Sequence, residues 1–270
     1  YINDVTTFVK GAIHEDRNDR SLNVQAYISM TGIAQSDVLS YHFSDVPFEA
    51  TFVVHWYHPM KWCVVSVRGS LDITDVGTDL CADSAKFLGG FAHRGMIVSA
   101  TFIWKKINKI LSIGAQEHPD YALVFTGHSL GAAVSSIVCA GQKRKIWAPP
   151  LTHDFKNMFS IGVGSPACFT REVARWCEPF IYSVSRNYDF ASRISVMTVD
   201  RLLMETSSNS MWTKTSDWTK SLFGGASAEE SQAQREKEVF ERPASEYLEL
   251  PGTIIHMYRP NLDKKAELHA

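Results

Sequence analysis

Residues 123–136, LVFTGHSLGAAVSS, constrain the fold more than any other stretch of the chain. The first half is an apolar run that predicts a buried strand, and the second half is rich in small residues that predict a closely packed helix. Gly127 and Gly131 flank Ser129 at equal distance. A sharp strand-to-helix turn needs small neighbours, and it presents a central serine hydroxyl at the top of the sheet. We therefore predict that Ser129 is a nucleophile and that the two glycines make room for the turn.

The segments around this turn alternate between strand and helix patterns, which predicts parallel strands joined by crossover helices. Earlier in the chain, two β-rich runs surround His58-Pro59-Met60-Lys61 and predict an antiparallel hairpin. The spacing of apolar residues in 95–112 predicts an amphipathic helix. The expected fold is therefore an α/β fold with a mostly parallel central sheet, helices on both faces and an antiparallel N-terminal hairpin.

Length and composition favour a single globular domain over residues 1–270. The chain is 45% hydrophobic and 21% charged, as in ordinary soluble domains. A polar segment at about 205–246 precedes the last predicted strand and is interpreted as an insert. The formal net charge of -2 gives no reason to expect nucleic acid as a partner. No apolar run is long enough to span a membrane, so any membrane contact is expected to be peripheral.

The chain has five cysteines, an odd number, with no CxxC spacing. We expect reduced, buried thiols in a domain that faces the cytosol, and consider a secreted disulfide protein the less favoured alternative. Asp72, Asp75 and Asp79 do not match the spacing of an EF-hand loop, so they are interpreted as loop and helix-cap residues. We predict no metal site.

A nucleophilic serine needs a base and an acid, which in this topology follow it in the order acid, then histidine. Asp189 comes directly after a predicted strand and its exit loop, with Asp200 as the second choice and Asp154 in a polar connection. His256 ends a short β-branched run. The other downstream histidines are His153, which precedes Asp189, and His269, which lies in a polar tail. We therefore predict that His256 takes the proton of Ser129 and that Asp189 orients His256.

An oxyanion formed at Ser129 needs two hydrogen-bond donors. The turn itself supplies the backbone N–H of Leu130, and Ser70, after the strand pattern VVSVRGS, is predicted to supply the second. The alternative for Ser70 is an ordinary Gly-Ser turn. This chemistry uses side chains, backbone donors and water, so no cofactor is required.

With these residues, the chain resembles the class 3 lipases of the α/β-hydrolase fold. The motifs VRGSLDITDVGTDL, AHRGMIVSA, GHSLGAA and PGTIIHM are most similar to the diacylglycerol lipase branch. The resemblance implies hydrolysis of the sn-1 acyl ester of diacylglycerol to 2-monoacylglycerol and a fatty acid. It also implies an acylglycerol substrate at a lipid surface and a membrane-associated location. Three alternatives stay open: a triacylglycerol lipase, a phospholipase A1 and a catalytically silent binding module. Calcium stimulation has no support in the sequence.

Two segments are candidates for contact with lipid. Phe87, Leu88 and Phe91 form either a small apolar flap hinged at Gly89-Gly90 or part of the core. In the polar insert, large apolar groups recur at helical spacing with lysines between them, as is typical of an interfacial helix. The alternatives there are a helix packed on its own domain and a loop. The insert residues concerned are Trp212, Trp218 and Leu222.

Overall fold

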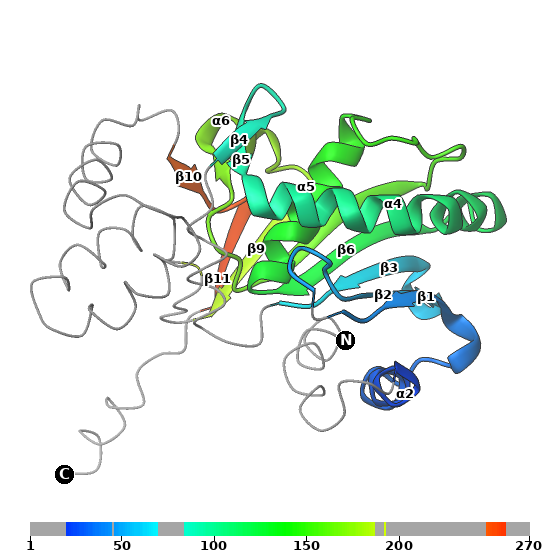
Figure 1. Ribbon diagram of the computed structural model, residues 1–270. Coiled ribbons are helices and arrows are strands. Elements are labelled where there is room, and N and C mark those ends of the chain that lie inside the picture. The colour runs from blue at the N-terminus through cyan, green and yellow to red at the C-terminus, as the bar shows by residue number, and fades with distance from the viewer. Residues whose placement is uncertain (1–19, 45, 70–83, 187–191, 193–246, 258–270) are drawn as a thin grey trace, which may run out of the picture.

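A seven-stranded sheet, mostly parallel, forms the centre of the molecule (Figure 1). The computed structural model describes residues 20–44, 46–69, 84–186, 192 and 247–257. The strand order is β1-β2-β3-β6-β7-β9-β11, in which the pairs β1–β2 and β2–β3 are antiparallel and the other pairs are parallel. The strands are β1 (Val38–His42), β2 (Phe52–Tyr57), β3 (Trp62–Val67), β6 (Ala122–His128), β7 (Asn157–Val163), β9 (Ile181–Arg186) and β11 (Thr253–Met257).

The predicted N-terminal hairpin is confirmed as β2 and β3. The short 3-10 helix η2 (His58–Met60) connects them, with Pro59 in its first turn and Lys61 in a left-handed conformation with φ 54°. Proline preorganises such a turn because its ring fixes φ. Strand β1 adds to β2 as the outer strand, after helix α2 (Arg20–Thr31) and the 3-10 helix η1 (Gln35–Asp37).

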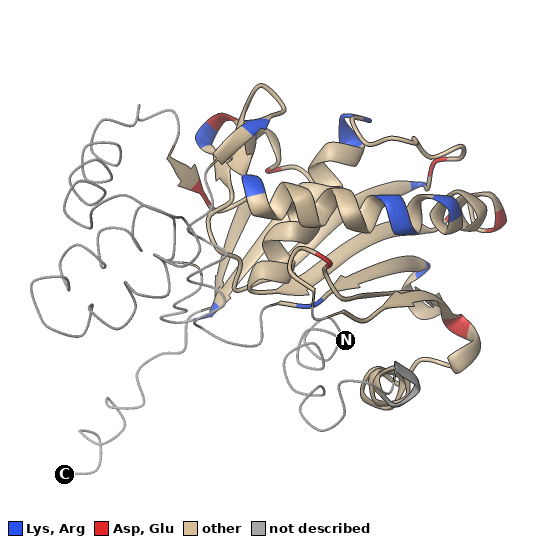
Figure 2. Ribbon diagram, viewed as in Figure 1, with Lys and Arg blue, Asp and Glu red and all other residues tan. Residues whose placement is uncertain are grey.

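Two helices cover one face of the sheet, and α2 packs on the other face beside β2 (Figure 1). They are α4 (Arg94–Glu117) and α5 (Leu130–Lys143). Every residue of α5 from 131 to 142 is buried, which explains why the sequence supplies small side chains there. The amphipathic helix predicted within 95–112 is confirmed as part of α4. Figure 2 shows basic residues on the outer side of α4, where Lys105, Lys106 and Lys109 are exposed.

A second, four-stranded sheet with order β10-β8-β5-β4 lies beside the main one, and the sequence did not predict it. It joins segments far apart in the chain: β4 (Ser84–Phe87), β5 (Gly90–His93), β8 (Phe169–Thr170) and β10 (Leu248–Glu249). Helix α6 (Arg171–Trp176) follows β8 directly. These strands are two to four residues long, too short to show a side-chain period.

The second sheet shows how residues 87–91 are packed. Phe87 is only 5% exposed, and its ring stacks on Phe169 at 5.7 Å between centroids. Leu88, with φ 52°, and Gly89, with φ 89°, form the tight turn of the β4–β5 hairpin. Phe91 is held through its backbone N–H, which donates to Thr170 Oγ1. The core alternative therefore holds for Phe87, because its ring fills the space between the hairpin and β8.

The cysteines within the described residues are buried and unbridged, as predicted. They are Cys63, Cys139, Cys168 and Cys177. Burial raises the pKa of each thiol, to about 12 for Cys177, so the reactive thiolate is suppressed at neutral pH. The insert candidates Trp212, Trp218 and Leu222 lie outside the described residues. Within the described ranges, no helix has the length and apolar composition needed to cross a membrane.

We predict that the fold loses stability at mildly acidic pH because of His55. This side chain is buried between β2 and α2, with its ring at 5.6 Å from that of Tyr27. Burial lowers the pKa of His55 to about 4, although the carbonyl of Trp56 and the nearby carboxylate of Asp37 oppose the shift. The unfolded chain protonates this group near pH 6.5, so it binds more protons than the folded chain between pH 6.5 and 4. Stability should therefore fall by about 3 kcal/mol as the pH falls through that range.

The measurement is urea unfolding of the wild type and His55→Phe at pH 7 and pH 4.5. Because a phenyl ring keeps the contact with Tyr27 but does not titrate, the variant should lose much less stability on acidification. Equal losses in the two proteins would contradict the assignment to His55.

Candidate active site

Ser129 occupies the turn between β6 and α5 in a backbone conformation that few non-glycine residues adopt. Its φ is 53° and its ψ is -127°. Its N–H donates to the carbonyl of Val163 at 2.9 Å, and its carbonyl accepts from the N–H of Ala132 at 2.9 Å. The hydroxyl makes no capping bond to helix α5, although Ser129 is the N-cap residue. The strained turn therefore leaves the hydroxyl available for another task.

Gly127 and Gly131 are necessary because backbone atoms of neighbouring segments occupy the space that their side chains would fill. A Cβ atom on Gly127 would lie 2.6 Å from the carbonyl oxygen of Val67, and one on Gly131 would lie 2.7 Å from that of Arg68. The Cβ atom on Gly131 would also overlap the carbonyl oxygen of Val67. The predicted role of both glycines, to make room for the turn, agrees with these contacts.

Gly69 is a third glycine of this contact, and its role was not identified from the sequence. A Cβ atom on Gly69 would overlap the carbonyl oxygen of His128 and lie 3.4 Å from Ser129 Cβ. The end of β3 therefore runs directly against the turn at Ser129. The glycine two residues after the strand VVSV is the sequence signal that could have shown this close approach. Ser70, the predicted oxyanion donor, is the next residue and lies outside the described residues.

The pairing of the parallel strands places His256 level with Ser129 along the strand direction. His128 pairs with Val163, Val163 with Val184, and Val184 with Ile255. Ser129 and His256 each follow this row by one residue, toward the carboxyl ends of the strands. Catalytic and binding groups of open α/β sheets gather at that edge. The structure thus brings the predicted nucleophile and base to the same edge, on strands separated by β7 and β9.

The other candidates for the acid and the base that the structure describes do not lie at this edge. Asp154 pairs with Lys145 at 3.3 Å, before the start of β7 and so at the opposite end of the sheet. His153 is exposed beside Thr152 in the same connection. Asp189, the predicted acid, follows the end of β9 by three residues and lies outside the described residues, as do Asp200 and His269.

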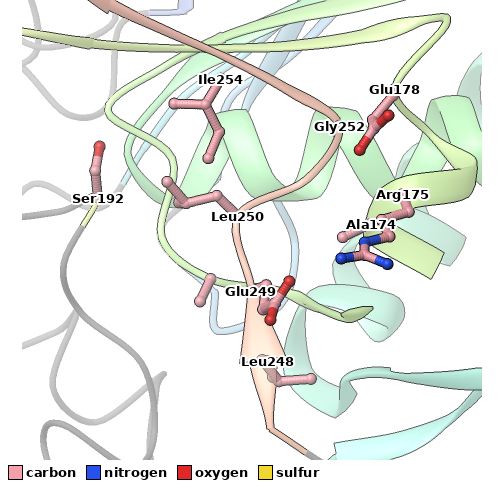
Figure 3. A pocket seen from close by; sticks show the side chains of 10 residues that line it. Ala174, Arg175, Glu178, Ser192, Leu248, Glu249, Leu250, Gly252 and Ile254 are labelled. Carbon is pink, nitrogen blue, oxygen red and sulfur yellow. The ribbon is translucent and has the colours of Figure 1, made fainter. Parts of the chain in front are cut away.

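A pocket of about 420 Å³ lies beside β11, between this strand, β10 and α6 (Figure 3). Its lining is mixed. Leu248, Leu250 and Ile254 are aliphatic, whereas Arg175, Glu178 and Glu249 carry charges. Ile254 and His256 are two residues apart on one strand, so their side chains leave β11 on the same face. The described residues contain no group of three or more potential metal ligands of the His, Cys, Asp or Glu type.

A serine held in a strained turn after a central parallel strand, before a buried helix, defines a nucleophile elbow. The fold and this site together are those of an α/β-hydrolase. The sequence model of the family described as lipase (class 3) matches residues 64–199, which include the elbow and the end of β9. The chain belongs to the class 3 lipase family, and the family and the fold support a lipid ester hydrolase.

Curated relatives agree with this membership. The chain is 27% identical to diacylglycerol lipase-beta of Mus musculus over 184 residues, which are 65% of this chain and 26% of that protein. It is 31% identical to diacylglycerol lipase-alpha of Homo sapiens over 118 residues, which are 38% of this chain and 11% of that protein. The match therefore spans 26% of the length of the first relative and 11% of the second.

Solved structures show the same fold. A Rhizomucor miehei lipase in complex with its propeptide has a TM-score of 0.54 at 18% identity, covering 72% of this chain and 61% of that one. A triacylglycerol lipase described as having a serine protease triad at its catalytic centre has a TM-score of 0.54 at 16% identity. There the match covers 72% of this chain and 69% of the other.

The strain at Ser129 leads to a stability prediction. Because glycine adopts φ 53° and ψ -127° without steric cost, Ser129→Gly should raise the free energy of unfolding by about 1–3 kcal/mol over Ser129→Ala. Alanine is the matched control, since it also removes the hydroxyl but keeps the Cβ atom. Urea unfolding of both variants measures the difference, and equal stabilities would show that the turn is relaxed.

Proposed function

We propose that this protein is a serine lipase that hydrolyses the sn-1 acyl ester of diacylglycerol to 2-monoacylglycerol and a free fatty acid. The observation that carries the proposal is the strained backbone of Ser129, whose hydroxyl does not cap the helix that follows. The choice of diacylglycerol is supported by the similarity to diacylglycerol lipases alpha and beta. A triacylglycerol or phospholipid substrate is the alternative that the assay below distinguishes.

In the proposed reaction, Ser129 Oγ attacks the ester carbonyl carbon while His256 takes the hydroxyl proton. The C–O bond to the glycerol then breaks, and the leaving alkoxide receives that proton from the imidazolium. The acyl group remains on Ser129 as an ester. His256 then takes a proton from water, and the hydroxide attacks the carbonyl carbon of this ester. The bond to Ser129 Oγ breaks, the fatty acid leaves, and the imidazolium returns the proton to Ser129 Oγ. Each proton that leaves one oxygen thus reaches another through the same imidazole.

The oxyanion of each tetrahedral intermediate requires donors close to Ser129. Leu130 is the first residue of α5, where backbone N–H groups have no partner within the helix and the helix dipole favours negative charge. Ser70 is the proposed second donor. Its neighbour Gly69 supports this role, because it lies against the backbone of His128 and the Cβ atom of Ser129.

Asp189 is the proposed acid, because it follows β9, the strand that pairs directly with the β11 strand of His256. A carboxylate there would accept the imidazole Nδ1–H and fix the tautomer in which Nε2 faces the serine. Asp200 is the second choice. The substrate class implies contact with a lipid surface, and we propose that the domain meets it peripherally from the cytosolic side.

The first test compares the wild type with Ser129→Ala on diacylglycerol, triacylglycerol and phosphatidylcholine in mixed micelles. The wild type should release fatty acid fastest from diacylglycerol, and the variant should lose about 10⁴–10⁶-fold in turnover, as other serine nucleophiles do. Ser136→Ala is the control, because this buried serine of α5 bonds only the carbonyl of Ala132. Its turnover should stay within about twofold, as is usual away from the reacting atoms.

If the wild type released fatty acid from none of the three lipids, the lipase proposal would be abandoned. A fluorophosphonate probe provides a second readout, because it labels an activated serine without requiring recognition of a lipid. Labelling should occur in the wild type and in Ser136→Ala but not in Ser129→Ala.

A second test separates the two acid candidates. Asp189→Asn should lower turnover on diacylglycerol by about 10⁴-fold, because the histidine then adopts the wrong tautomer. Asp200→Asn should leave turnover nearly unchanged. The reverse pattern would transfer the role of the acid to Asp200.

A further inference from the structure

The loop between β1 and β2 carries two apolar side chains into solvent. Val46 is 57% exposed and Phe48 is 47% exposed, with Pro47 between them. We call these three residues the apolar tip. Within the described residues most large apolar side chains are buried. A proline-stiffened turn that exposes an aromatic ring beside a valine is therefore a candidate contact surface.

Phe48 also has a backbone conformation that normally favours glycine. The N–H of Glu49 donates to the carbonyl of Val46 at 3.1 Å, which closes a four-residue turn. Pro47 occupies the second position of the turn. Phe48 occupies the third position, with φ 64°. Glycine is the favoured residue at positive φ in such a turn, so local structure alone does not account for the aromatic residue.

Hydrogen bonds hold the turn in place. Thr51 Oγ1 accepts from the N–H of Ser44 at 3.1 Å and donates to the carbonyl of Ser44 at 3.2 Å. Ser44 Oγ accepts from the N–H of Val46 at 3.1 Å and donates to the carboxylate of Glu49, also at 3.1 Å. Glu49 further lies 3.5 Å from His42 Nε2. The charge of Glu49 is thus engaged within the loop, and the apolar tip is presented by a braced turn.

The apolar tip lies at the same edge of the sheet as the nucleophile. Phe52, the first residue of β2, pairs with Val67, and Val67 pairs with Gly127. Arg68 connects the two regions, since its side chain donates to the carbonyl of Ser44 at 3.3 Å and its N–H donates to Thr51 at 2.9 Å. The residue after Arg68 is the glycine that packs against Ser129.

Helix α4 extends the apolar surface. The ring of Phe48 lies over Gly95, where a Cβ atom would be 3.0 Å from Phe48 Cε1. Val98, 48% exposed, is one turn further along α4. Arg94 is exposed one turn before Val98 on the same side of the helix, and its guanidinium reaches the carbonyl of Ser84 at 3.5 Å. The exposed apolar surface thus has an arginine at its border.

We propose that the apolar tip and Val98 dock this protein onto a phospholipid bilayer, with Arg94 at the level of the anionic headgroups. The proposal rests on the proposed function, because the substrate of a lipase lies in such a surface. Two observations favour lipid as the occupant: the continuity of the tip with the nucleophile edge and the cation that borders it. Apolar side chains enter the headgroup boundary while arginine stays at the phosphates.

The test measures sedimentation of the full chain with vesicles of phosphatidylcholine and phosphatidylserine. Phe48→Gly should lower the partition coefficient by about 5- to 10-fold, since roughly half a phenyl ring is lost from the lipid contact. Its midpoint of thermal unfolding should equal or exceed that of the wild type, because glycine suits φ 64°. Phe48→Leu should keep most of the binding.

Met60→Ser and Val46→Ser form a matched pair. Met60, 54% exposed, lies in the β2–β3 turn at the opposite end of the sheet from Val46. Only Val46→Ser should weaken vesicle binding. Hydrolysis of a soluble short-chain ester should be unchanged in all four variants, while hydrolysis of vesicle diacylglycerol should fall in Phe48→Gly and Val46→Ser.

Vesicle binding of Phe48→Gly equal to that of the wild type would overturn the docking proposal. The proposal would also be overturned if Phe48→Gly bound vesicles like the wild type but no longer self-associated, because the apolar tip would then contact a second copy of the chain. Failure of the proposed function is a separate result: the wild type would bind vesicles through Phe48 but hydrolyse neither ester.

Discussion

The close approach of the end of β3 to the turn after β6 is the constraint on which the rest of the site depends. Val67 and Arg68 contribute their carbonyl groups to a space that only glycine leaves open at positions 127 and 131. A side chain at either position would separate the two strands at the edge where the nucleophile emerges. The elbow is therefore a property of two neighbouring strands as much as of the motif GHSLG.

The same packing explains how the protein tolerates strain at Ser129. The turn is fixed from both sides, by the carbonyl of Val163 and by the first turn of a helix that is buried from residue 131 to residue 142. A large core, which includes Phe125, Trp104 and Leu111, offsets the cost of one unfavourable residue. The free energy gained by hydrophobic burial elsewhere thus compensates for the strained backbone at Ser129.

The sequence predicts the parts of this fold that depend on neighbouring residues. The β6–α5 unit and the β2–β3 hairpin follow from periodicity and turn residues, and both are confirmed. The second sheet could not be predicted, because β10 pairs with β8 across nearly eighty residues and each contributes only two. Phe87 was ambiguous for the same reason, since the ring that covers it, Phe169, belongs to β8.

Some features of the site could likewise be predicted from the sequence, and others could not. The glycine-flanked turn selects Ser129, and chain order together with the strand pattern selects His256; the strand register brings both to one edge. The glycine after β3 is visible in the sequence, but its contact with His128 is a tertiary property that only the structure shows. The apolar tip was also missed, because an exposed valine and phenylalanine in a short loop resemble an ordinary strand end until their exposure is known.

The position of β11 has a consequence for the order in which the site is assembled. Strands β3 and β6 and helix α5, which together form the elbow, all precede β9 in the chain. Strand β11 pairs with β9 only after residues 187–252 have been closed into a loop, and contacts of long sequence separation form late in folding. A nascent chain therefore contains its serine before it has the histidine strand, and the edge that carries both residues is complete only after β11 has paired with β9.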